Sequence, residues 1–482
     1  MKKILFAASE AMPFAATGGL GDVIGSLPAA IKKKGGDDVD VRVVMPLYSA
    51  IGTEWREKMT EEYVFNVNLA WRYLYCRVMS LEKDGVIYYF IDNEYYFKRD
   101  TLYGCYDDGE RYAYFCTAVL SMLQFIDFFP DILHAHDWQT ALSIIYLKTI
   151  FASDERYRRI KGIFTIHNIE YQGQYDFSIL GDVFNLGTLQ HNIVEYGSCI
   201  NLMKGAIVCA DKVTTVSPTY AKEILQPYYS WGLDPILRQN SGKLSGILNG
   251  IDYDYYNPAK DKKIAKTFSS KKLSDKYENK VALQRELALP ESRDVPMVAI
   301  VSRLAAHKGI DLISEIAYRL VAEGDIQLVI LGKGTPEYEG FFRNLENSFP
   351  NRVRAMIMYD RDLSKRVYAA ADIFLMPSKS EPCGLAQMIA SRYGAIPLVR
   401  ETGGLYDTIR YYDEVTGEGN GFTFADYNAH DMLYTIRKAL SLYRDNKQAW
   451  NRLANVCMKK DFSWDVPAQE YLALYKEIIN LD

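Results

Sequence analysis

The chain has 482 residues, a formal net charge of −5 at pH 7, and 49% hydrophobic and 24% charged residues. This is ordinary globular composition, so it excludes a disordered, collagen-like or fibrous architecture. The near balance of charges gives no general electrostatic reason to bind nucleic acid or an anionic membrane. The sequence also offers no run of roughly 20 apolar residues, the length that a membrane helix needs.

The cysteines and the first residues indicate a cytoplasmic protein. Seven cysteines are an odd number and none form a CxxC pair, which favours free thiols over disulfides or structural zinc. The apolar run at 4–8 is short and is soon followed by Glu10, so it predicts a β-strand rather than a signal peptide.

Short apolar runs alternate with helical segments in the first half of the chain. This pattern is typical of parallel strands covered by helices on both faces. We expect residues 61–69 and 88–92 to form a hairpin-like insertion. The predicted strands are 3–9, 41–47, 131–135, 162–167 and 212–216, and the predicted helices are 22–34, 111–124 and 141–151.

The same rhythm restarts after residues 252–280, which contain no buried-strand run. Two such halves predict two doubly wound α/β domains joined by a hinge, with ligands in the cleft at the carboxyl ends of the strands. Lysines at 260–280 could form a nucleic-acid patch, but a solvated face is the favoured interpretation. The predicted strands are 297–304, 327–332, 353–359, 373–377 and 396–399, and the predicted helices are 311–323, 363–370 and 386–393.

Two Gly-Gly-Leu segments, one in each half, each follow a strand and open a helix. They are Thr17-Gly18-Gly19-Leu20-Gly21-Asp22 and Glu401-Thr402-Gly403-Gly404-Leu405. Paired glycines let backbone N–H groups approach a phosphate, and the helix N-terminus favours negative charge. Each segment could equally be a tight turn, and Asp22 could be a helix cap.

Charged residues follow two strands of the second half. Arg303 and Lys308 are five residues apart, and such a pair suits a diphosphate leaving group whose charge grows as its bond breaks. Glu381 lies in a loop between prolines and a glycine, where it could accept hydrogen bonds from a sugar or stabilise positive charge. Solvated surface cations and a turn carboxylate are the alternatives.

The histidines lie at strand ends. His134 and His136 share one face of a predicted strand, which invites a metal-site interpretation, but no further spaced ligand set appears. His167, at the end of the next strand, is a better candidate for substrate contact than for metal binding. A hydrogen-bonded structural histidine remains the alternative there.

Taken together, these segments make the chain resemble the bacterial glycogen synthases and plant starch synthases. The likeness extends almost from end to end, and several motifs in the same order form a specific signal. The motifs are TGGLGDVIGSLP, DDGERYAYFC, HAHDWQTAL, FTIHNIEYQGQY, TTVSPTYAKEI, LNGIDYDYYNP, SRLAAHKGID, ADIFLMPS, EPCGL and ETGGLYDT.

The resemblance implies a GT-B fold, in which two Rossmann-like doubly wound domains face a deep inter-domain cleft. It implies domains 1–251 on the acceptor side and 252–464 on the donor side, with the helix 465–482 packing back on the first domain. The implied reaction is retaining transfer of glucose from ADP-glucose to the non-reducing end of an α-1,4-glucan, without a metal or other cofactor. It implies no nucleic-acid or membrane partner, and nothing in the sequence specifies an oligomeric state.

The resemblance also assigns roles to individual residues. The implied catalytic group is Glu381, Arg303, Lys308, His167 and Asp137. The implied donor-binding group is Ala16, Gly18, Gly19, Asp22, Asn249, Tyr359, Cys383, Gly384, Leu385, Thr402, Gly403 and Gly404. The implied acceptor-binding group is Tyr95, Tyr96 and Trp138.

The chain departs from the family pattern at a few positions. Ala16 stands where the family usually has a lysine, and Lys379-Ser380 precedes Glu381 where Arg-Phe is usual. These departures bear on donor affinity and rate more than on fold. Two alternative functions stay open at this point: a catalytically weak glucan-binding or regulatory relative, and a different nucleotide-sugar enzyme of the same fold.

Overall fold

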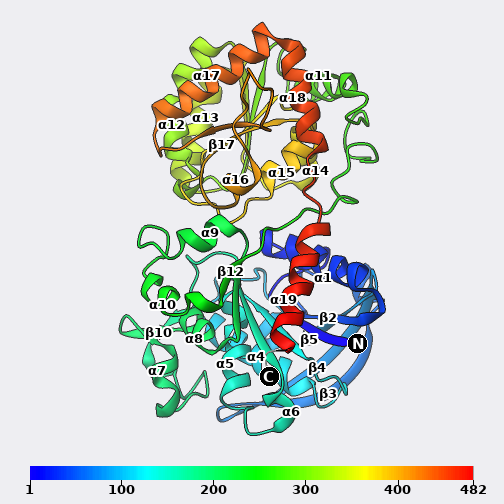
Figure 1. Ribbon diagram of the computed structural model, residues 1–482, viewed down its shortest axis with the longest axis vertical. Coiled ribbons are helices and arrows are strands. Elements are labelled where there is room, and N and C mark those ends of the chain that lie inside the picture. The colour runs from blue at the N-terminus through cyan, green and yellow to red at the C-terminus, as the bar shows by residue number, and fades with distance from the viewer. Residues whose placement is uncertain (481–482) are drawn as a thin grey trace. The chain divides into compact units, whose positions relative to one another are not determined.

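The structure is a computed structural model that describes residues 1–480. The chain divides into two compact units (Figure 1). Unit 1 comprises Met1–Gly250 and the segment that begins at Trp464, and unit 2 comprises Ile251–Ser463. The C-terminal helix α19 (Asp465–Ile479) therefore groups with the first part of the chain, where it contacts α1 (Gly19–Gly35).

Unit 1 is built on a nine-stranded sheet with the order β12-β11-β7-β6-β1-β2-β5-β4-β3. In this order, each neighbouring pair of strands from β12 to β5 is parallel. Strands β4 and β3 then extend the sheet at one edge with antiparallel pairing. The strand bounds are β1 (Lys2–Ala7), β2 (Val39–Pro46), β3 (Thr60–Leu69), β4 (Arg72–Lys83), β5 (Val86–Asp92), β6 (Ile132–His136), β7 (Lys161–Ile166), β11 (Lys212–Thr215) and β12 (Leu244–Gly246).

The prediction that residues 61–69 and 88–92 pair with each other in a hairpin-like insertion was wrong. Residues 61–69 and 88–92 are both strands, but β3 pairs with β4, which the sequence analysis missed, and β5 pairs in parallel with β2. Strand β4 was missed because its outer positions carry Tyr73 and Tyr75, so the alternation of apolar and polar residues is weak.

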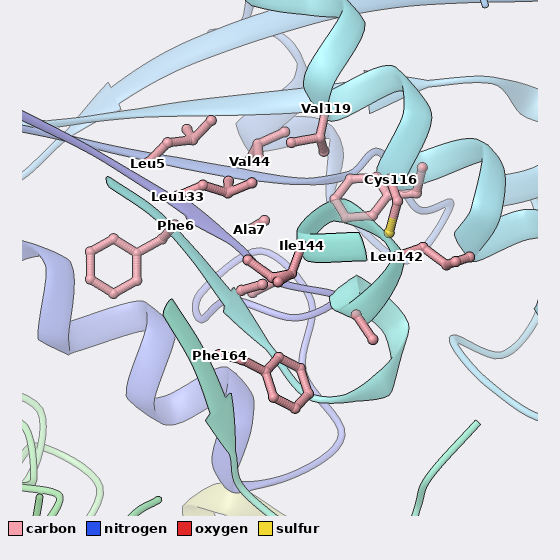
Figure 2. Close-up of a cluster of buried hydrophobic side chains, with 14 of the residues drawn as sticks. Leu5, Phe6, Ala7, Val44, Cys116, Val119, Leu133, Leu142, Ile144 and Phe164 are labelled. Carbon is pink, nitrogen blue, oxygen red and sulfur yellow. The ribbon is translucent and has the colours of Figure 1, made fainter. Parts of the chain in front are cut away.

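Helices cover both faces of the unit 1 sheet. On one face, α4 (Asp108–Met122) and α5 (Trp138–Lys148) contribute Cys116, Val119, Leu142 and Ile144 to the cluster in Figure 2. Leu5 and Phe6 point to opposite sides of β1 because successive side chains of a strand alternate between its faces. Phe6 lies 4.9 Å from His134 and 5.5 Å from His136, measured between ring centroids.

Unit 2 contains a six-stranded, fully parallel sheet with the order β15-β14-β13-β16-β17-β18. The strand bounds are β13 (Met297–Val301), β14 (Gln327–Leu331), β15 (Val353–Met356), β16 (Ile373–Met376), β17 (Ile396–Arg400) and β18 (Phe422–Phe424). The main helices are α11 (Lys276–Glu286), α12 (Ile310–Gly324), α13 (Pro336–Ser348), α14 (Arg361–Ala370), α15 (Ala386–Arg392), α16 (Gly403–Thr408), α17 (Ala429–Asp445) and α18 (Lys447–Lys459).

The predicted α/β class with two doubly wound parallel sheets is confirmed. Five strands predicted in each half are present, with ends that differ by a few residues. All seven cysteines are free thiols, as expected. Among residues 1–480, no helix is both long enough and apolar enough to cross a membrane.

Candidate active site

Several of the predicted site residues of each unit lie in loops where the strand order reverses. In unit 1 the chain leaves β1 toward β2 on one side and later returns with β6 on the other. In unit 2 the same reversal lies between β13 and β16. Loops at the carboxyl ends of such strand pairs diverge, and the crevice between them is the usual ligand site of an open α/β sheet.

The first Gly-Gly segment is held by a carboxylate that the sequence analysis did not single out. The buried Glu10 side chain accepts hydrogen bonds from Thr17 N (2.6 Å), Thr17 Oγ1 (2.7 Å) and Gly18 N (3.3 Å). A methyl group added at Gly18 would meet no atom within 4 Å, so this backbone borders open space. The loop therefore presents accessible backbone at the start of α1.

Ala16 and Asp22 flank this loop. Ala16 is partly exposed, and a methyl group added at Gly21 would lie only 2.2 Å from its Cβ. The helix cap is Gly18 rather than Asp22, which lies in the first turn of α1, where its charge suits the helix dipole.

Asp137 follows β6 in an unfavourable backbone conformation, with φ 59° and ψ 177°. This region is essentially restricted to glycine, and its occupation by another residue costs about 1–3 kcal/mol. The carboxylate accepts a hydrogen bond from His167 N at 2.7 Å, which joins the ends of β6 and β7. Burial raises the pKa of Asp137 to about 7, although hydrogen bonds from the backbone of His167 and Asn168 act in the opposite direction.

Replacing Asp137 with asparagine is expected to raise the free energy of unfolding at pH 8 by about 2 kcal/mol, after reduction for partial exposure. A raised folded-state pKa means that the ionised carboxylate destabilises the fold increasingly as the pH rises from about 4 to about 7, and by a constant amount above that. Asparagine has no such charge, and it is nearly isosteric with aspartate, so the same backbone conformation and its cost are kept in both chains. Denaturant unfolding at pH 8 and pH 4 measures the effect, which should vanish at pH 4.

Asp176→Asn is the matched control for that experiment. The hydroxyl and N–H of Ser178 lower the pKa of this exposed carboxyl, so the same substitution should reduce stability at pH 8. A gain at Asp137 that is equal at both pH values would contradict the assignment of its pKa.

Three histidine rings lie in β6 and just after β7, with His134 and His136 buried and His167 partly exposed. His134 Nδ1 lies 2.9 Å from Tyr475 Oη of α19, and His134 Nε2 lies 2.6 Å from Thr165 Oγ1. His136 Nδ1 lies 2.9 Å from His167 Nε2. Burial lowers the pKa of His134 and of His167 to about 3, and it lowers that of His136 well below its ordinary value. All three rings are therefore neutral at physiological pH.

The expected acceptor-binding aromatics differ in accessibility. Tyr95 is 70% exposed, and Trp138 is partly exposed at the start of α5. Tyr96 is fully buried and donates its hydroxyl hydrogen bond to Glu110, so its predicted role as an acceptor-binding ring was wrong. Its burial follows from its position in the short helix α3 (Glu94–Phe97), where it packs 4.9 Å from the Tyr114 ring.

Asn249 lies in unit 1, after β12. It is 5% exposed, and its Oδ1 is buried without a hydrogen-bond partner among residues 1–480. An unpaired buried acceptor costs free energy, so a ligand donor at this oxygen would remove a penalty that the protein otherwise bears.

In unit 2, the loop after β13 carries Arg303 and Lys308. Gly309 ends the short 3-10 turn with φ 74°, and a methyl group added there would lie 2.1 Å from the carbonyl oxygen of Pro377. Lys379 N also donates to His307 O at 2.9 Å. These contacts hold the loop after β13 against the loop after β16.

This contact brings Lys308 to Glu381. The Lys308 ammonium donates to both carboxylate oxygens, at 2.9 Å and 2.6 Å, and the Ser378 hydroxyl donates to Glu381 Oε2 at 2.9 Å. Glu381 is 6% exposed. Arg303 lies on the exposed side of the same loop, with Nη2 3.5 Å from His307 Nε2.

The second Gly-Gly segment packs directly on the Glu381 loop. Gly403 has φ 44°, and a methyl group there would lie 2.0 Å from Glu381 O. Gly404 N donates to Glu381 O at 3.1 Å. The structure therefore brings together three predicted segments of unit 2, which contain Arg303, Lys308, Glu381, Cys383, Gly384, Leu385, Thr402, Gly403 and Gly404.

Other predicted residues of unit 2 lie in different settings. Cys383 and Thr402 are buried, which suits shaping of the loop. Tyr359 is 65% exposed beyond β15, and its hydroxyl accepts a hydrogen bond from Arg361 Nε at 2.7 Å. Its ring is thus available for stacking.

Three residues that support the site were missed at the level of sequence. Glu10 organises the first Gly-Gly loop, and Ser378 binds Glu381. Buried Arg400 donates to Lys379 O at 2.8 Å and so holds the Glu381 loop from β17. Ser378 had a local signal, because it lies three residues before Glu381, but Glu10 and Arg400 had none beyond being charged residues next to apolar strands.

No group of three or more His, Cys, Asp or Glu side chains with metal-binding geometry occurs in residues 1–480. The pair His134 and His136 does share one strand face, with ring centroids 4.3 Å apart. Three of their four ring nitrogens instead lie within hydrogen-bond distance of Tyr475, Thr165 and His167.

Comparisons with protein families match both parts of the chain. Residues 3–239 match the starch synthase catalytic domain family, and residues 286–454 match the glycosyl transferases group 1 family. The chain is 48% identical over 479 residues to the glycogen synthase of Anoxybacillus flavithermus, covering 99% of this chain and 98% of that protein. It is 47% identical over 478 residues to a glycogen synthase of Bacillus cereus, covering 99% of both.

Solved structures agree with these relatives. The catalytic domain of starch synthase IV from Arabidopsis thaliana, bound to ADP and acarbose, matches with a TM-score of 0.92 and 35% identity over 99% of both chains. Sucrose-phosphate synthase from Thermosynechococcus elongatus matches over 100% of both chains with a TM-score of 0.63 and 15% identity, which indicates a shared fold alone.

Proposed function

The chain belongs to the glycogen synthase family, and from that premise we propose that it transfers glucose from ADP-glucose to the non-reducing end of an α-1,4-glucan with retention of configuration. The observation that carries the proposal is the cluster of Lys308, Glu381 and the second Gly-Gly segment, in a chain 48% identical to a glycogen synthase over nearly its full length. No metal or other cofactor is part of the proposal, and the proposed location is the cytoplasm.

The proposed role of Arg303 and Lys308 is to bind the diphosphate of the donor. As the bond from glucose to the diphosphate breaks, negative charge grows on the leaving oxygen, and fixed cations stabilise that charge most in the transition state. A leaving group stabilised in this way needs no acid to protonate it. Backbone N–H groups at the start of α16, with Thr402 and Gly403, would bind the same charge.

Glu381 is proposed to lie beside the transferring glucose. Its carboxylate is already oriented by Ser378 and neutralised by Lys308, so it does not face water as an isolated charge. When the diphosphate binds, Lys308 would be shared between two anions, and Glu381 would stabilise positive charge that develops on the sugar.

The residues of unit 1 are proposed to bind glucose and the acceptor. His167 and Asp137 are joined by the 2.7 Å hydrogen bond and can offer polar groups to sugar hydroxyls. Tyr95 and Trp138 offer accessible aromatic surface for stacking on a glucan. A front-face attack, in which the leaving phosphate takes the acceptor proton, is the proposed route to retention.

Incorporation of labelled glucose into glycogen tests the proposed function. ADP-glucose and UDP-glucose are supplied separately, and the product is digested with an enzyme specific for α-1,4 linkages. We expect incorporation from ADP-glucose and release of all label by digestion. Binding of glycogen without nucleotide release would instead identify a catalytically weak glucan-binding relative.

Ala16→Lys is expected to raise kcat/KM for ADP-glucose about tenfold. The family usually has a lysine at this position, and a charge-assisted hydrogen bond to the donor contributes about 1.5–3 kcal/mol. Ala16 is partly exposed, so a longer side chain can extend toward solvent from this position. Steady-state kinetics with varied ADP-glucose measure the effect.

Ala16→Gln is the matched control, since it lengthens the side chain without adding charge and should not improve kcat/KM. An unchanged or lower value for the lysine variant would show that the loop has been rebuilt around alanine. Pairing of the new lysine with the nearby Glu10, which already binds Thr17, is the physical route to that result.

A further inference from the structure

The hydrogen bond between His136 and His167 has a direction that the structure determines. His136 is 0% exposed, and its Nδ1 lies 2.9 Å from His167 Nε2. Two neutral imidazoles can place only one proton between these nitrogens, so one ring donates and the other accepts. The remaining proton position on each ring follows from that choice.

The surroundings of His136 Nε2, the ring nitrogen that is not bonded to His167, determine which of the two rings donates. Its Nε2 is buried and has no hydrogen-bond partner among residues 1–480. A proton on Nε2 would be a buried donor without an acceptor, whereas a bare Nε2 is an unpaired acceptor, which proteins tolerate more readily. His136 therefore carries its proton on Nδ1 and donates it to His167 Nε2.

The neighbours of His136 reinforce this assignment. Phe6 stacks on its ring at 5.5 Å with an interplanar angle of 13°, and His134 lies 4.3 Å away between ring centroids. His134 is itself bonded to Tyr475 and Thr165, so it offers no nitrogen to His136. The ring can neither turn nor find another partner without disturbing both neighbours.

We propose that His136 is a positioning residue that holds His167 in the Nδ1–H tautomer, so that His167 acts as a hydrogen-bond donor to a sugar hydroxyl. His167 Nδ1 makes no hydrogen bond within residues 1–480, and it is not among the fully buried unpaired atoms. Its N–H can therefore reach a ligand. The inference deepens the proposed function and rests on it, because it assumes that His167 contacts the substrate.

Nitrogen NMR of the histidine-labelled full-length chain reads the tautomer directly. With ¹⁵N-labelled histidine, His167 should show a one-bond proton coupling at Nδ1 and none at Nε2, and His136 should also be protonated at Nδ1. His167→Gln and His136→Gln chains assign the signals. Protonation of His167 at Nε2 in the parent chain would overturn the inference without any need for a variant to be active.

Kinetics of three His136 variants test the functional consequence. Asparagine places an amide N–H near the position of Nδ1, glutamine places one near Nε2, and leucine places none. We expect kcat to fall about tenfold in His136→Leu and His136→Gln, from loss of one oriented hydrogen bond, and to be largely recovered in His136→Asn. KM for glycogen should change little.

A purely structural role of His136 predicts a different order of kcat among the three variants. Asparagine leaves the larger void among Phe6 and His134, so stability should rank glutamine at or above asparagine. His134→Gln is the matched control, because it disturbs the same buried stack without touching His167, and its kcat should stay within a few-fold of the parent value. If kcat of the three variants follows their melting temperatures instead, His136 contributes to packing and does not position His167.

His167→Ala separates failure of this inference from failure of the proposed function. If His167→Ala and His136→Leu both turn over like the parent, the proposed site itself is misplaced. If His167→Ala loses most of its activity while His136→Leu keeps it, only the positioning role fails.

Discussion

Replacing Lys308 with alanine is expected to lower kcat by about 10²–10³-fold, the usual effect of removing one group that stabilises charge in a transition state. The structure adds a second effect, because Lys308 is also the ion-pair partner of Glu381 at 2.6 Å. Its loss leaves a mostly buried carboxylate with only the Ser378 hydroxyl, which costs up to about 3–5 kcal/mol of stability. Initial rates and denaturant unfolding measure the two effects separately.

The double variant Lys308→Ala/Glu381→Gln distinguishes the loss of rate from the loss of stability. Neutralising Glu381 removes the unpaired charge, so stability should return toward that of the parent, while activity should stay lost. Arg303→Ala should lower kcat with little change in stability, because its side chain is exposed. Parent-like turnover of both Arg303→Ala and Lys308→Ala would refute the diphosphate assignment.

Lys263→Ala is the control for general loss of an ion pair in unit 2. Lys263 binds Asp362 at 2.6 Å, with side chains 55% and 44% exposed. Exposed pairs contribute about 0–1 kcal/mol, so this variant should keep both its stability and its rate.

Acidification from pH 7.5 to pH 5 is expected to destabilise unit 1 by several kcal/mol. The pKa of His134 and that of His167 are lowered to about 3, and that of His136 is also strongly lowered, in each case mainly by burial. The unfolded chain takes up these protons below about pH 6.5 but the folded chain does not. Stability is therefore full above pH 6.5 and is lost as the pH falls toward 3.

The size of the acid effect follows from the linkage relation. Each histidine contributes about 1.4 kcal/mol per pH unit, or about 2 kcal/mol at pH 5. Asp137 acts in the opposite direction, because its raised pKa of about 7 relieves a destabilising charge on acidification. The stability regained from Asp137 offsets about the loss from one histidine. The net loss of stability is therefore about 3–4 kcal/mol, a large part of a typical folding free energy.

Urea unfolding at the two pH values, followed in parent and variant chains, measures this loss. His134→Gln should reduce the difference between pH 7.5 and pH 5, since one titrating group is removed. His430→Gln is the control, because the His430 side chain is 74% exposed. Equal stability of the parent at both pH values would show that the buried rings take up protons in the folded state.

Most of the fold could be predicted from the sequence because its signals are local. Short apolar runs and helical periodicity involve neighbours along the chain, and they located the strands of both sheets to within a few residues. As exceptions, strands β4, β12 and β18 were not predicted: Tyr73 and Tyr75 interrupt the pattern of β4, and the other two strands are only three residues long each.

The candidate site was predicted in part, for a related reason. Paired glycines and charges at strand ends mark loops that can bind phosphate, so both Gly-Gly segments and the loops of Lys308 and Glu381 were found. The burial of Tyr96 was not predicted, because a tyrosine in a short helix gives the same sequence pattern whether its ring faces solvent or Tyr114.

The α/β class, the two doubly wound halves and the segments that carry chemistry could be predicted from patterns along the chain. Which side chains meet depends on the way these segments fold together. Lys308 and Glu381 are 73 residues apart, and His136 and His167 are 31 apart. Such pairs depend on strand order and on loops that pack at the reversal points, as at Gly309 and Gly403, where any side chain would collide with the neighbouring backbone. Periodicity specifies which face of an element is buried, but the partner across that face is set by the packing of the whole sheet.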